Sequence, residues 1–267
     1  MDIKNFEELM KNDIKNIFEQ ILSFHNYILP ISSRSRSGAE ISDYLEDYFV
    51  KLLADNDHPR IYNADSAPKG KTKNPFDFRF YYKYDNDDFH FDDVIWGDIK
   101  ASKFSYNDSN PDLGTPTKVI KFMLDGHFYL MFVFFEYVST DDNKTKFIQF
   151  DNNDYVKVVF LKDIHHSVRI NPKPQFQVNI HEPEEYRTKE EFLDLFLQKY
   201  KESNNRIIKK ATKKNEELDS IFDKIKEIQF MKKQWFNSLL FQYILLVLLK
   251  FHIFYILIYS ILYIHFH

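Results

Sequence analysis

Three charged residues in two neighbouring segments have the types and spacing needed to hold a metal ion and direct water at a phosphate. The first segment, NPFDFRFYYKY, begins at Asn74, alternates as a strand does, and contains Asp77. In the second, DDVIWGDIKASK, Asp98 and Lys100 lie two residues apart, so in a strand their side chains share a face. Two carboxylates suit a hard divalent cation, and an ammonium beside them can orient the attacking water and offset charge on the phosphate. The pattern indicates metal-dependent phosphodiester cleavage.

The alternation in the first segment also predicts which of its side chains enter the core. Residues of one parity on a strand face one side of the sheet. The aromatic residues of that parity, expected to face a single core, are Phe76, Phe78, Phe80 and Tyr82. Asp77 has the other parity, so we expect it to be displayed and not buried among them.

These residues resemble the PD-(D/E)xK nuclease superfamily and, within it, the type II restriction endonucleases. The matching residues are NPFD, with Pro75 and Asp77 as a variant of the Pro-Asp element, and GDIK, with Asp98 and Lys100 as the (D/E)xK element. Phe76 is an insertion relative to the simple Pro-Asp element. The resemblance implies that Asp77 and Asp98 are Mg²⁺ ligands and that Lys100 acts at the attacking water.

The resemblance also implies an auxiliary acid on the helix that precedes the hairpin. In RSGAEISDYLEDYF, Glu40 is the preferred match as a further catalytic residue, and Glu46 is the alternative. The implied enzyme is a cytoplasmic homodimer that cuts double-stranded DNA, because two active sites are needed to cut both strands of a palindrome. A DNA methyltransferase that protects the host is the genetic partner expected for such an enzyme.

Two polar segments beside the proposed site are candidates for DNA contacts. SAPKGKTKNP is a basic loop directly before Asp77, and FSYNDSNPDLGTPTK is an irregular loop directly after the second strand. Lysines suit phosphates, and asparagines and lysines suit groove contacts, although both segments also fit plain solvated loops. The candidate DNA-binding residues are Lys69, Lys71, Lys73, Lys103, Asn107, Asn110, Thr115 and Lys118.

Composition is consistent with a globular enzyme. The 267 residues are 44% hydrophobic and 28% charged, which excludes a disordered chain. The formal net charge of −4 gives no overall attraction to DNA, but local patches decide steering. With no cysteine there is no disulfide framework and no thiolate metal site, as suits a cytosolic protein.

Periodicity predicts an α/β fold with a mixed β-sheet flanked by helices, and the resemblance implies that this fold is of the restriction-endonuclease type. Helices are expected at the N-terminus, after Ser37, and from Thr188, where Thr188 and Glu191 form a capping-box pattern. Beyond the two segments above, the expected strands are HFYLMFVFFEYV as a central strand, KFIQFDNNDYVKVVFLKDI as a second hairpin, and FQVNI as a short last strand.

The C-terminal segment is different in kind. Residues 236–267 are almost continuously apolar with one lysine, long enough to cross a bilayer. Either this tail is a membrane helix, against which Lys250 near its middle counts, or it is an atypical end that is not native to the fold. We therefore divide the chain into an endonuclease domain, 1–233, and an apolar tail, 234–267.

Other interpretations remain beside the leading one. The rival functions are a membrane-anchored, non-enzymatic binding protein and a DNA repair nuclease of the same fold. The pair His165 and His166 suggests a metal site, but adjacent residues in a strand point to opposite faces. We interpret both histidines as structural.

Overall fold

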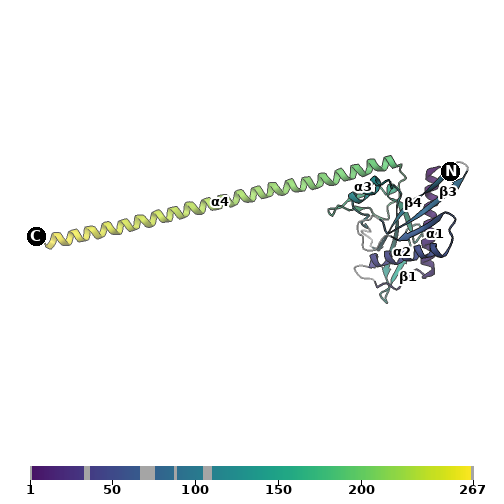
Figure 1. The fold of residues 1–267 in the computed structure, drawn as a ribbon. Coiled ribbons are helices and arrows are strands. Elements are labelled where there is room, and N and C mark those ends of the chain that lie inside the picture. The colour runs from purple at the N-terminus through teal and green to yellow at the C-terminus, as the bar shows by residue number, and fades with distance from the viewer. Residues whose placement is uncertain (1, 33–36, 67–75, 87–88, 105–109, 266–267) are drawn as a thin grey trace. The chain divides into compact units, whose positions relative to one another are not determined.

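The computed structural model describes residues 2–32, 37–66, 76–86, 89–104 and 110–265, with the side chains placed as far as Ile256. The chain divides into two compact units, Met1–Asn205 and Arg206–His267. The first unit contains the sheet and every predicted site residue that the structure describes. Figure 1 shows the order of the elements along the chain.

The helices of the first unit begin where the sequence supplies a cap. In α1 (Ile3–Phe24), the Asp2 side chain accepts a hydrogen bond of 2.8 Å from the Asn5 amide. In α3 (Pro116–Leu124), Thr115 is the N-cap and Pro116 occupies the first turn, where its missing N–H costs nothing. The second helix is α2 (Ser37–Asp55), and the first turns of α4 (Lys189–His265) also belong to this unit.

Seven strands form one mixed sheet in the order β1-β6-β5-β4-β3-β2, and β7 also pairs with β5. Strands β4 and β5 are parallel, with α3 in the connection between them, whereas the other pairs are antiparallel. The strands are β1 (Ile28–Leu29), β2 (Ile61–Ser66), β3 (Phe78–Asn86), β4 (Phe89–Lys103), β5 (Leu130–Ser139), β6 (Thr145–Ile148) and β7 (Lys157–Phe160). A short helix, η1 (Leu161–Asp163), and a small second sheet of β8 (Arg169–Ile170) and β9 (Phe176–Gln177) follow.

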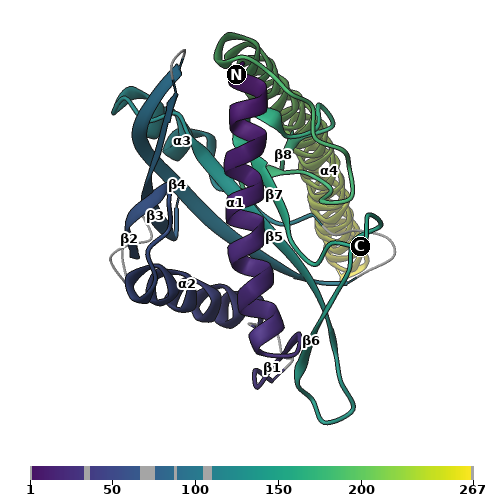
Figure 2. The ribbon, with the colours of Figure 1, turned by 90° about the vertical axis from the view of Figure 1, so that its right-hand side faces the viewer.

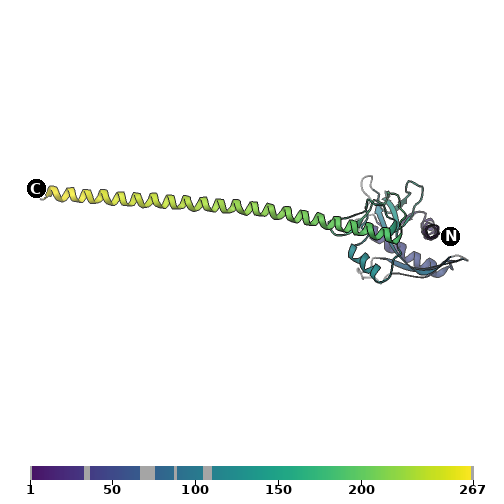
Figure 3. The same cartoon turned by 90° about the horizontal axis from the view of Figure 1, so that it is seen from above.

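Each face of the main sheet has its own core. Helices α1 and α2 lie on one face (Figure 2). The core on that face contains Phe78, Phe80 and Ile99. On the other face α3 and the start of α4 bury Trp96 with Phe122 and Phe192. Figure 3 shows α1 nearly end-on, along one face of the sheet. The predicted α/β class with a mixed sheet flanked by helices is confirmed.

Two predictions about the main sheet were wrong. Phe76 does not join Phe78 in the first core, because it precedes β3 and packs on Trp96 in the second core, with ring centroids 4.1 Å apart. The expected second hairpin is not a hairpin either. Strands β6 and β7 each pair with β5, at opposite ends of it, and not with each other. The alternation predicted the strands, but pairing is decided by the long apolar β5.

The second unit is helical throughout its described residues. Its helix, α4, begins in the first unit, where the predicted capping box is confirmed, since the Thr188 and Glu191 amides donate to each other's side chains at 2.8 and 3.2 Å. From Arg206 to Ile256 almost every side chain is exposed. The helix includes a stretch long and apolar enough to span a membrane, with a mean hydropathy of 2.0 and none of it buried. Its length and composition fit both interpretations of the tail.

Candidate active site

The site lies where β3 leaves the edge of β4. The pairing of the two strands ends at Phe78 and Gly97, whereas β4 continues to Lys103 beside β5. Asp77 stands at this fork. Its amide donates to the Gly97 carbonyl at 2.8 Å, and its carboxylate accepts from the Ile99 amide at 2.9 Å. The Asp77 side chain therefore takes the place of the missing strand and is fixed against β4.

Helix α2 covers the rest of the open edge. The Ser42 hydroxyl donates to the Ile99 carbonyl at 3.0 Å. Gly38 approaches so closely that a Cβ atom there would lie 2.5 Å from the Ala101 carbonyl oxygen, so only glycine fits. These contacts fix both the distance and the rotation of α2 relative to β4 (Figure 2).

Asp98 and Lys100 point to the same face of β4, the face opposite the α1 and α2 core. The Lys100 ammonium donates to Asp98 Oδ1 at 2.5 Å, and the Asp98 side chain is only 8% exposed. Their register partners on β5, Phe132 and Phe134, are buried and form an apolar floor. Asp77, Asp98 and Lys100 are thus brought together.

The charges in this cluster are incompletely balanced. Burial, opposed by the Lys100 charge and reinforced by the nearby Asp77 carboxylate, raises the pKa of Asp98 to about 8. For Lys100 burial acts to lower the pKa, but Asp98, Asp77 and Asp112 outweigh burial, so the net shift is upward. The lysine therefore keeps its charge at neutral pH, whereas Asp98 is held mostly protonated, because burial and the Asp77 charge disfavour its ionised form. Such a pair of carboxylates is stabilised by a cation.

Glu46, and not Glu40, is the glutamate of α2 that faces this cluster. Glu46 is 8% exposed, and burial raises its pKa to about 7, with the Asp77 charge contributing in the same direction. It lies one turn beyond Ser42, on the face that contacts β4. Glu40 is exposed and lies nearly opposite Ser42 around the helix. The angular position of each residue around α2, counted from Gly38, shows which glutamate faces β4. The sequence alone does not show that Gly38 is on the face that meets the sheet.

The donor set fits a hard divalent cation. Asp77, Asp98 and Glu46 offer carboxylate oxygens only, which is the ligand type that Mg²⁺ and Ca²⁺ prefer. The pKa values of the buried Asp98 and Glu46 are raised, and a bound cation would reverse that shift. These three residues are the ones that could hold the metal.

The DNA-binding candidates are only partly placed. Lys69, Lys71, Lys73 and Asn107, together with Pro75 of the motif, lie outside the described residues. Lys103 is exposed at the end of β4, whereas Asn110, Thr115 and Lys118 are half-buried.

The loop that contains Asn110 and Thr115 lies close to the candidate catalytic lysine. Asp112 lies between them in the sequence, and its charge contributes to the raised pKa of Lys100. Its carboxylate accepts a hydrogen bond of 2.7 Å from Gln177. Thr115 accepts from the Lys118 amide at 3.4 Å as the cap of α3, so its hydroxyl has a structural role. The loop therefore borders the site, as a DNA-contacting segment must.

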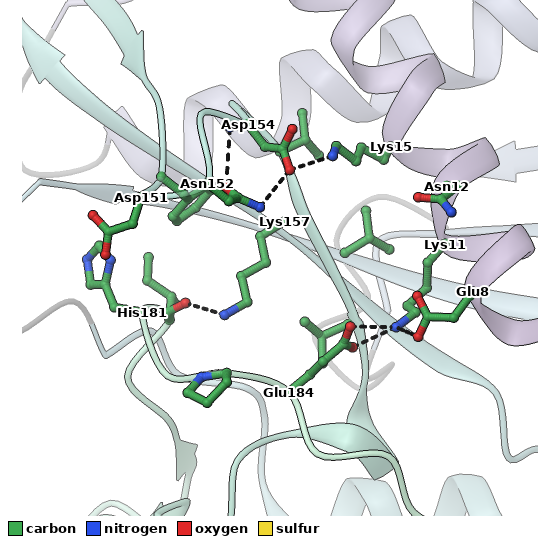
Figure 4. A pocket seen from close by; sticks show the side chains of 16 residues that line it. Glu8, Lys11, Asn12, Lys15, Asp151, Asn152, Asp154, Lys157, His181 and Glu184 are labelled. Carbon is green, nitrogen blue, oxygen red and sulfur yellow. Dashed lines mark hydrogen bonds and ion pairs between the residues drawn. The ribbon is translucent and has the colours of Figure 1, made fainter. Parts of the chain in front are cut away.

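A cavity of about 410 Å³ between α1 and the 180–184 segment is a separate feature (Figure 4). Two ion pairs lie in it, Lys11 with Glu184 at 2.7 Å and Lys15 with Asp154 at 2.5 Å, and Lys157 donates to the Ile180 carbonyl at 2.7 Å. The residues of the acidic cluster do not line it. Its internal pairing indicates a structural role for this cavity.

Comparison with known proteins gives one result that covers most of the chain. The family model described as SwaI-like, SwaI restriction endonuclease, matches residues 2–218. No curated protein sequence matches the chain significantly. The matched range contains Asp77, Asp98, Lys100 and Glu46, together with helices α1, α2 and α3.

Proposed function

Because the chain belongs to the SwaI-like restriction endonuclease family, we propose that it is a type II enzyme that hydrolyses double-stranded DNA at a specific sequence, using Mg²⁺. We assign the site to the PD-(D/E)xK type and the sheet to the restriction-endonuclease fold. The observation that carries this assignment is the meeting of Asp77, Asp98 and Lys100 at the fork between β3 and β4.

Each residue of the cluster has a distinct role in the proposal. Asp77 and Asp98 supply the metal ligands, and Glu46 supplies a third carboxylate. A bound divalent cation would polarise the scissile phosphate and lower the pKa of a coordinated water. Lys100 orients the attacking water and offsets the negative charge that develops on the phosphate. Its raised pKa favours this role as a charge over a role as a general base.

The rigidity of the site supports the same function. Asp77 is held by two backbone contacts to β4, and Lys100 is held against Asp98, so neither side chain has to be ordered when DNA binds. The loop through Asp112 lies beside Lys100, where it can contact the duplex near the cut. We place Asn110 and Lys103 among these contacts, with the basic residues Lys69, Lys71 and Lys73 before Asp77.

The proposal includes the assembly expected of this class. Two chains would bind a palindromic duplex as a homodimer in the cytoplasm, each cutting one strand. A methyltransferase of the same sequence specificity would protect the host DNA.

The test is digestion of plasmid DNA by the purified full-length chain. A discrete set of fragments is expected with Mg²⁺ and no cutting with EDTA. Asp98→Asn should produce no fragments yet still retard the same DNA in Ca²⁺, because Asp98 holds metal and reads no bases. Discrete fragments from Asp98→Asn at the wild-type rate would refute the site. The absence of sequence-specific cutting by the wild type would refute the function.

A further inference from the structure

His165 and His166 do not lie in a strand, as the argument from opposite faces assumed. They follow η1 in a turn, where both rings lie on one side with centroids 4.1 Å apart. Glu185, from the irregular segment 181–188 that leads into α4, reaches the same place. A third ligand group, the Glu185 carboxylate, therefore comes from about twenty residues downstream of the two histidines.

The three side chains have the geometry of an incomplete coordination shell. One ligand atom from each of His165, His166 and Glu185 lies within 4.8 Å of the other two. Glu185 Oε1 is 2.6 Å from His166 Nδ1 and 3.5 Å from His165 Nε2. Donors around a tetrahedral ion with bonds of 2.0–2.1 Å are about 3.3 Å apart, so small side-chain rotations suffice. Glu182 Oε2, at 3.8 Å from His165 Nε2, can supply a fourth donor.

Surrounding groups hold these donors in the required orientation. Glu185 Oε2 accepts from the His166 amide at 3.0 Å and pairs with the Arg187 guanidinium. This leaves Oε1 turned toward the two imidazoles. The Ser167 hydroxyl lies 2.8 Å from His165 Nδ1, and the Ser167 amide donates to the same nitrogen at 3.2 Å, so the ring is fixed with Nε2 toward Glu185. A metal at Nε2 requires the tautomer with the proton on Nδ1, which then donates to the Ser167 hydroxyl in place of the bond from the amide. Outer partners of this kind orient ligands in metal sites.

We propose that His165, His166 and Glu185 form a second metal site, for a transition metal of the zinc class, apart from the Mg²⁺ site. Two imidazoles and one carboxylate suit Zn²⁺ or Co²⁺, whereas Mg²⁺ prefers oxygen ligands alone. Metal binding replaces the hydrogen bond between His166 and Glu185 with two bonds to the ion. The ion ties the turn after η1 to the segment before α4, and thus stabilises the first unit. The site does not depend on the proposed DNA cleavage.

The experiment measures zinc binding to the full-length chain by calorimetry, after EDTA treatment and buffer exchange, with excess Mg²⁺ to occupy the acidic cluster. Co²⁺ absorption in the visible range reports the ligand set in parallel. His166→Ala and Glu185→Gln are each expected to weaken zinc binding at this one site at least tenfold, so that one equivalent is no longer bound at the concentrations used. The matched control is His90→Ala. His90 is 64% exposed and lies 3.5 Å from Asp85, much as His166 is 66% exposed and lies beside Glu185.

The outcomes separate clearly. Wild-type stoichiometry in His166→Ala, or an equal loss in His90→Ala, would overturn the proposal. His166→Gln keeps a hydrogen-bond donor for Glu185 and still loses zinc if the proposal is right, so a loss of folding in the alanine variant does not decide the result. Zinc should also raise the melting temperature of the wild type and not that of His166→Gln. Cleavage with Mg²⁺ should be the same in all these variants.

Discussion

Replacing Glu46 with glutamine should stabilise the metal-free protein above neutral pH. Burial and the charge of Asp77 raise the pKa of Glu46 from 4.5 to about 7, so its ionised form is disfavoured in the folded state. At ~1.4 kcal/mol for each pKa unit, ionisation costs about 3 kcal/mol more in the folded state than in the unfolded state. A bound cation would offset this cost by stabilising the ionised Glu46 carboxylate, which explains a buried glutamate at this position.

The pH dependence follows from the direction of the shift. Because the pKa is higher in the folded state, the folded protein binds more protons between pH 4.5 and 7. The contribution of Glu46 to stability is therefore complete below pH 4.5 and is lost as the pH rises through 7. The gain from Glu46→Gln should be about 1 kcal/mol at pH 5 and about 3 kcal/mol at pH 8.

The assay is urea unfolding in EDTA at pH 5 and pH 8 for the wild type, Glu46→Gln and Glu40→Gln. Glu40 lies on the same helix but is exposed, so its replacement should change the free energy of unfolding by less than about 0.5 kcal/mol. Mg²⁺ should restore stability to the wild type and much less to Glu46→Gln. If Glu46→Gln and Glu40→Gln show the same difference from the wild type at both pH values, the placement of Glu46 is refuted.

Two further predictions concern other parts of the chain. Lys162→Ala should cost about 3–5 kcal/mol in urea unfolding, because it leaves Glu7 and Asp163 buried without their cation, 2.8 Å away in each case. An unchanged urea midpoint would show that the ion pairs of Lys162 with Glu7 and Asp163 do not stabilise the fold. Removing the residues after Lys233 should leave the DNA fragment pattern unchanged, since Asp77, Asp98 and Lys100 belong to the unit Met1–Asn205. Loss of folding in this truncation would mean that the tail is part of the core.

The sequence predicted the parts of the fold that depend on local pattern. The strand period of two placed Asp98 and Lys100 on one face, and the long apolar run became β5 in the centre of the sheet. The capping box at Thr188 was also predictable, because it requires only residues three apart.

Features that depend on contacts distant in sequence could not be predicted in this way. The choice between Glu40 and Glu46 is made by the rotation of α2 on β4, which Gly38 and Ser42 determine. Strands β6 and β7 pair with the two ends of β5 and not with each other, and local alternation carries no signal for this choice of partner. The His165 turn meets Glu185 through the path of the 181–188 segment, for which no periodicity gives a signal.

The most direct test of the central claim is the single-turnover cleavage rate of Lys100→Ala at saturating enzyme and fixed low salt, which separates chemistry from affinity. Lys83→Ala, an exposed lysine on β3, is the control. The roles proposed for Asp98 and Lys100 predict that Lys100→Ala binds DNA and metal but loses several orders of magnitude in rate, with little rescue by Lys100→Arg, because a guanidinium presents its donors in a different geometry. A Lys100→Ala rate within about threefold of the wild type would make Lys100 an ordinary strand lysine and would contradict the proposed active site.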